Sequence, residues 1–131
     1  MDPKDIADLF SQATARIEFY WNFLVVALVA ILGWLFTTNR ALGTTERAAI
    51  TVGYLIFAVM NIIGLYGAYT FADALKRDLL LSCGLAETLP NATAALGKVN
   101  YRLQRQIMFA VHALVAVILL TAIWKARPRP A

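Results

Sequence analysis

The sequence contains few of the residues that carry chemistry in most enzymes. It has one cysteine, Cys83, and one histidine, His112, among 131 residues. A single cysteine excludes an intramolecular disulfide, and one cysteine with one histidine cannot form the ligand cluster of a zinc site. The sequence also lacks a glycine-rich phosphate loop and a nucleophile elbow. We therefore expect a protein that is not an enzyme, and we assign no catalytic residue, metal site or small-molecule substrate.

Charged residues are scarce as well. Only 15% of the chain is charged and 60% is hydrophobic, whereas a soluble domain has about 25% charged and about 45–50% apolar residues. The net charge of +4 does not indicate a nucleic-acid partner, because the basic residues flank apolar runs and form no basic stripe with aromatic residues. The charged residues among the first eight are three aspartates and one lysine, unlike the basic start of a signal peptide, so we expect the first apolar segment to act as an uncleaved anchor.

The sequence does contain long runs without charge. We expect the run 48–72 to cross a lipid bilayer as a helix, with further transmembrane helices at 19–36 and 106–124. A helix of about 20 apolar residues is long enough to cross the hydrocarbon. The sequence thus predicts one domain of the all-α class, a polytopic membrane protein with three transmembrane helices.

The segments outside these runs also show helical spacing. Apolar residues in 3–16 recur at three- and four-residue steps, which predicts an amphipathic helix that either continues into the first span or bends onto the membrane surface. The same steps in 73–105, interrupted by Pro90, predict an extramembrane helical hairpin whose second arm is capped by Asn91. A re-entrant or surface-lying segment is the alternative there. We expect the basic, proline-rich tail 125–131 to be disordered.

Aromatic and basic residues indicate how the chain sits in the membrane. Trp21, Trp34 and Trp124 lie near the ends of the apolar runs, so we assign them as interfacial anchors. The N-terminus and the hairpin share one side, which carries more lysine and arginine than the other. The positive-inside rule therefore predicts a cytoplasmic N-terminus and hairpin in a bacterial-type inner membrane, whereas the compact basic tail favours the reverse orientation.

Polar side chains inside the runs are costly in hydrocarbon and should face other helices. Counting inward from the side of the N-terminus predicts a polar intramembrane cluster of Asn22, Tyr66, Tyr69 and His112, with Asn61 deeper and alone near the midplane. Three interpretations of His112 stay open. It is part of a proton or ion route, it forms a structural hydrogen bond to Tyr66 or a backbone carbonyl, or it is an axial ligand of haem or another porphyrin pigment.

Small residues in the central run suggest close helix packing. Gly53, Gly64 and Ala68 share one face of the helix, which favours tight contact inside the protomer or between protomers. Asn61 is a further candidate for a contact between subunits, because an amide at the midplane of a three-helix chain has few partners of its own.

These features favour a non-enzymatic integral membrane protein that acts as a structural or accessory subunit of a homo-oligomer or a larger membrane complex. The hairpin would be its soluble docking element. One alternative is a small oligomeric ion channel or pore lined by Asn61, Tyr54 or His112. The other is a haem- or pigment-binding subunit that uses His112.

Overall fold

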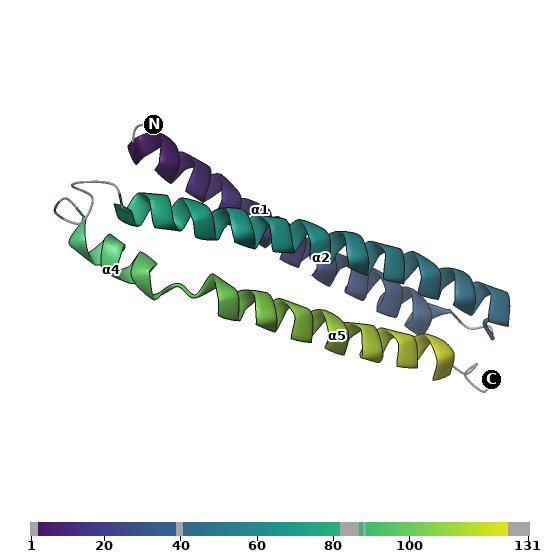
Figure 1. The fold of residues 1–131 in the computed structure, drawn as a ribbon. Helices are drawn as coiled ribbons and strands as arrows, with labels where there is room; N and C mark the ends of the chain where they lie inside the picture. The colour runs from purple at the N-terminus through teal and green to yellow at the C-terminus, as the bar shows by residue number, and fades with distance from the viewer. Residues whose placement is uncertain (1–2, 39–40, 82–86, 88, 126–131) are drawn as a thin grey trace.

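Every regular element in the described part of the computed structural model is a helix (Figure 1). The structure describes residues 3–38, 41–81, 87 and 89–125. The helices are α1 (Pro3–Thr37), α2 (Thr44–Leu81), α4 (Pro90–Lys98) and α5 (Tyr101–Lys125). The three long ones, α1, α2 and α5, are each long and apolar enough to cross a membrane. The all-α class and the three candidate spans are therefore confirmed.

The three long helices lie side by side along most of their length (Figure 1). The start of α1 and the short helix α4 lie at one end of the molecule, and the end of α5 lies at the other. We call these the α4 end and the α5 end. The short connection between α1 and α2 makes these two helices antiparallel neighbours, as expected for spans joined by few residues.

The amphipathic segment and the first span form one uninterrupted helix, α1. At about 1.5 Å per residue, its 35 residues extend about 52 Å. The 38 residues of α2 extend about 57 Å by the same measure. Both lengths exceed the hydrocarbon thickness of about 30 Å, so each helix is longer than one crossing of a bilayer requires.

Contacts at the α5 end join the N-terminal part of α2 to the last turn of α5. The backbone N–H of Gly43 donates to Oε2 of Glu46 at 3.0 Å, which satisfies a free donor at the start of α2. Arg47 Nη1 donates to the backbone carbonyl of Trp124 at 2.6 Å, and Trp124 Nε1 donates to Oγ1 of Thr51 at 3.3 Å. The carbonyls of a final helical turn lack partners within their own helix, so Arg47 supplies one.

The predicted hairpin differs from the structure in two places. Its second arm begins at Pro90 and not after a cap at Asn91, because proline needs no N–H partner in a first helical turn. The arm is then interrupted, since α4 ends at Lys98 and α5 starts at Tyr101. Asn100 Oδ1 accepts a hydrogen bond from the N–H of Leu103 at 3.0 Å, so Asn100 caps α5. Residues 82–86 and 88 of this hairpin and 126–131 of the predicted tail lie outside the described residues.

A lysine of α2 binds the backbone at the junction between α4 and α5. Lys76 Nζ donates to the carbonyl of Val99 at 2.6 Å and lies 3.4 Å from the carbonyl of Gly97. Substitution of Lys76 by methionine keeps the alkyl stem and removes the ammonium group that makes both contacts. We expect faster amide hydrogen exchange over residues 96–103 in this variant, because the junction loses an interaction with α2 of about 1 kcal/mol.

The control for this substitution is Arg77→Met. The Arg77 side chain is 73% exposed and pairs only with Asp73 on the same helix, at 2.8 Å, among the contacts that the structure gives. Exposed pairs of this kind contribute little, so exchange over 96–103 should stay unchanged. Equal exchange in the parent chain and in Lys76→Met would contradict this role of Lys76.

Two apolar clusters form the core. The first lies toward the α4 end and joins all three long helices through Ala13, Leu65, Ala72 and Met108. The second lies toward the α5 end around Tyr54, Ala58 and Leu119. Along α2 and α5, the residues between these clusters include the two buried polar side chains of the described chain, Asn61 and His112.

Candidate functional site

A polar pair lies between the two apolar clusters. Asn61 of α2 is 3% exposed and His112 of α5 is 2% exposed. Their side chains meet at 3.0 Å, between Asn61 Nδ2 and His112 Nε2. Buried polar groups need hydrogen-bond partners, so this contact favours one register of α5 against α2 over its neighbours.

The partners of His112 define its hydrogen-bonding state. Nδ1 lies 2.9 Å from the backbone carbonyl of Met108, one turn earlier on α5. A carbonyl only accepts, so Nδ1 carries the hydrogen and donates it. Nε2 then has a lone pair that accepts from the amide of Asn61. Both ring nitrogens are therefore engaged by partners within the chain.

The pair has one unused polar atom. Asn61 Oδ1 is buried and has no hydrogen-bond partner in the described part of the chain. A half-turn of the amide would present this oxygen to Nε2, which would then have to carry a hydrogen to donate. The Asn61 amide therefore fits His112 in the orientation that turns Nδ2 toward Nε2.

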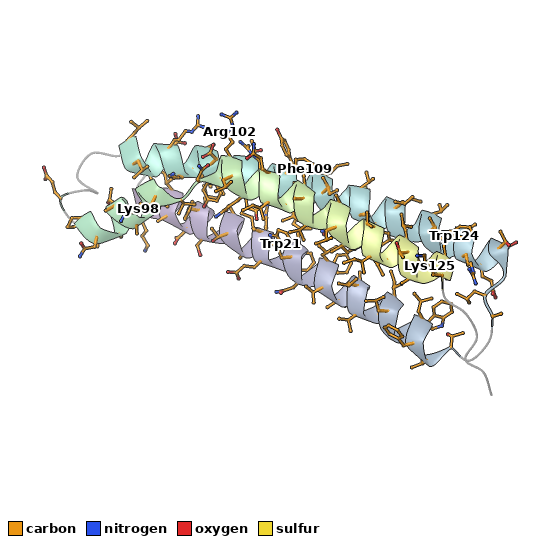
Figure 2. All side chains as sticks on the ribbon, turned by 90° about the horizontal axis from the view of Figure 1, so that it is seen from below. Trp21, Lys98, Arg102, Phe109, Trp124 and Lys125 are labelled. Carbon is orange, nitrogen blue, oxygen red and sulfur yellow. The ribbon has the colours of Figure 1, made fainter. Side chains whose placement is uncertain are left out.

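Trp21 of α1 completes the contact between the three helices. Its ring centroid lies 5.8 Å from that of His112, and its Nε1 donates to the hydroxyl of Tyr69 at 2.9 Å. Tyr69 in turn lies beside Tyr101, with ring centroids 6.2 Å apart. Figure 2 shows Trp21 near the middle of the molecule's length. This central group contains Trp21, Asn61, Tyr69 and His112, and it draws on all three long helices.

The central group overlaps the predicted polar cluster only in part. Tyr69 and His112 both belong to it, joined through Trp21. Asn22 has an exposed side chain, and Tyr66 is 49% exposed. Tyr66 contacts Phe109 and lies under the guanidinium of Arg105, which is 5.6 Å from its ring centroid.

The offset between α2 and α5 explains the difference. The prediction from the sequence places the charged residues Asp73 and Arg105 at the same depth in the membrane. Counting inward from them then puts His112 level with Tyr66. In the structure Arg105 Nη1 donates to Oγ1 of Thr70 at 3.2 Å, so Arg105 lies deeper along α2 than Asp73 does. A long arginine stem allows this placement, since its head group can reach over neighbouring side chains. His112 therefore meets Asn61, five residues along α2 from the predicted level of Tyr66.

The predicted stripe of small residues has contacts of different kinds. The ring of Tyr20 of α1 packs over Gly64, where a methyl group would overlap it. Ala68 is buried in the first apolar cluster. Gly53 is exposed, and a methyl group there would meet nothing within 4 Å. Gly64 and Ala68 thus make contacts within the chain. The need for glycine at position 64 comes from Tyr20, which α1 places opposite it.

The three tryptophans predicted as interfacial anchors differ in their exposure. Trp34 and Trp124 are exposed, whereas Trp21 lies partly buried between helices. Trp124 and Lys125 lie together at the α5 end, far from Lys98 at the α4 end (Figure 2). Exposed tryptophans near helix ends fit the interfacial belts of membrane proteins, and Trp21 has the additional internal contacts described above.

The fold and the central group define a class of protein, a bundle of three candidate transmembrane helices joined by a buried polar contact. Among the described residues, no cluster of three histidine, cysteine, aspartate or glutamate side chains could hold a metal ion. Comparisons with protein-family models, with curated proteins and with solved structures gave no match for this chain.

Proposed function

We propose that this chain is a non-enzymatic integral membrane protein that acts as a structural or accessory subunit of a membrane assembly, made of its own copies or of other chains. One observation carries the proposal. The first apolar cluster continues along α1 and α2 beyond their apolar runs, with Ala13 of α1 and Leu75 of α2 buried in it. The part of the bundle that would stand outside a bilayer is therefore packed like the part within it.

A packed extension of this kind suits docking. Ile6, Leu9 and Phe10 of α1 pack against the same cluster, so the face of α1 near its start is used within the chain. The extension keeps its shape without a partner, and its outer surface is available to one. In our proposal the α4 end and the N-terminus lie in the cytoplasm of a bacterial-type cell, as the distribution of lysine and arginine favours.

The geometry of the central group supports this role over the channel alternative. Asn61 and His112 face each other inside one protomer, and Tyr54 is buried in the second apolar cluster. A pore between protomers needs such side chains on an outer face. The central group instead joins helices of the same chain, which is what a structural contact does.

The same geometry does not fit the haem or porphyrin alternative. An axial ligand needs a ring nitrogen with a free lone pair that points to the iron. In His112 the lone pair of Nε2 accepts from Asn61 and Nδ1 is bonded to the Met108 carbonyl. Ligation would have to break one of these buried contacts.

The proposal is tested by the native mass of the protein extracted from its own membrane at natural expression. We expect a particle larger than the 14.4 kDa chain with its bound detergent and lipid, containing several copies or a co-purifying protein. A monodisperse particle with one 14.4 kDa chain and no other protein would contradict the proposal.

A further inference from the structure

A basic cavity lies where α2 passes the junction of α4 and α5. Its volume is about 490 Å³. The charged residues that line it are Asp73, Lys76, Arg77, Lys98, Arg102 and Arg105. Five cations and one anion leave an excess of four positive charges, which equals the net charge of the whole chain.

Several of these cations already have partners within the chain. Arg77 pairs with Asp73, Lys76 binds the carbonyl of Val99, and Arg105 contacts Thr70. The Lys76 and Arg105 contacts join α2 to the α4–α5 side of the cavity, whereas the Arg77–Asp73 pair lies within α2.

Two cations of the cavity are unengaged. Within the described ranges, Lys98 and Arg102 have neither a hydrogen bond from their side chains nor an ion pair. Both side chains are exposed. The cavity therefore presents two available cations over a shaped, positively charged floor, which is the chemistry that recognises a phosphate group.

The surroundings distinguish a lipid phosphate from a soluble one. From Arg102 toward the C-terminus of α5 the outer surface becomes apolar, with Ile107 50% exposed and Phe109 48% exposed. Arg102 and Phe109 lie along the same side of the molecule (Figure 2). The basic cavity is thus adjacent to an apolar surface that runs along the span. A phospholipid has the same order of parts, an anionic head followed by acyl chains.

We propose that this cavity binds the phosphate headgroup of an anionic phospholipid, with Lys98 and Arg102 as the contacting cations and the acyl chains along α5 past Phe109. Basic pockets between transmembrane helices are suited to such headgroups. The inference rests on the membrane placement in the proposed function but not on the assembly, because a single chain contains the whole site.

The experiment uses the full chain in neutral detergent and counts bound lipid by native mass spectrometry during titration with phosphatidylglycerol or phosphatidylcholine. We expect phosphatidylglycerol to bind and phosphatidylcholine to bind at least tenfold more weakly. Arg102→Gln should weaken phosphatidylglycerol binding about fivefold, and the double variant Lys98→Gln/Arg102→Gln should weaken it further, since each surface cation contributes about 1 kcal/mol.

Lys125→Gln is the matched control, because it removes one exposed lysine at the α5 end. It should bind phosphatidylglycerol like the parent chain. Unchanged melting temperature and helicity of the variants will show that their folds are intact. Equal binding of the two lipids, unchanged binding in the double variant, or an equal loss in Lys125→Gln would overturn the proposal. Displacement of the lipid by millimolar inorganic phosphate would overturn it too, in favour of a soluble phosphate ligand.

Discussion

Replacement of His112 by leucine is expected to lower the free energy of unfolding by about 1–3 kcal/mol. The loss arises because Asn61 keeps its buried amide and has no partner for it. Asn61→Leu should cost about as much, since it leaves the lone pair of Nε2 without a donor. Reversible unfolding in mixed micelles or bicelles measures both values.

The double variant Asn61→Leu/His112→Leu separates the pair from simple loss of packing. It removes both polar groups, so its cost should fall well below the sum of the single variants. Asn22→Leu is the matched control, because Asn22 is an asparagine with an exposed side chain on α1, and we expect it to change stability by less than about 0.5 kcal/mol. Single variants without effect, or a double variant whose cost is their sum, would show that the pair does not join α2 to α5.

Gly64→Ala is expected to destabilise the bundle by about 1–3 kcal/mol, the usual cost of overpacking. The added methyl group would overlap the ring of Tyr20, so α1 must move away from α2 or the ring must leave its position. The effect should disappear in a Tyr20→Ala background, because the ring is then absent. Unfolding of the two variants and their parents forms one double-mutant cycle.

Gly67→Ala provides the control, three residues further along the same helix. A methyl group there meets nothing within 4 Å, so the variant gains helix propensity at no steric cost. We expect its stability to stay equal or to rise by up to about 1 kcal/mol. Equal effects of the two alanine substitutions would mean that the packing of the Tyr20 ring against α2 does not require a glycine at position 64.

The composition and the long charge-free runs were sufficient to predict the helical class and the three candidate spans. A long run without charge predicts a helix from its own residues, so the prediction for Ala48–Ala72 needs no information from the rest of the chain. The pattern of Pro3–Arg16 similarly predicted a helix, and the absence of a breaker before the first span left one continuous helix as an open interpretation, which α1 adopts.

The central group needed information that a sequence alone does not carry. The pairing of Asn61 with His112 depends on the sliding of α5 along α2, and the sequence offers only the charged residues as markers of depth. Arg105 was a poor marker of depth, because its long side chain places the guanidinium beside Tyr66 and Thr70 and not level with Asp73. The break at Asn100 had a local signal, since asparagine is a preferred N-cap, but the apolar steps through Val99 and Leu103 favoured a continuous arm.

The most direct test of the account is the accessibility of single cysteines in intact membrane vesicles, in a Cys83→Ser background. A membrane-impermeant maleimide should label Asp8→Cys and Lys98→Cys from one side only and Thr45→Cys from the other side only. Ile63→Cys should not react, because Ile63 is 61% exposed on the bundle and would then face lipid. Labelling of Ile63→Cys from either side, or labelling of Thr45→Cys from the same side as Asp8→Cys, would contradict a bundle of three membrane-spanning helices.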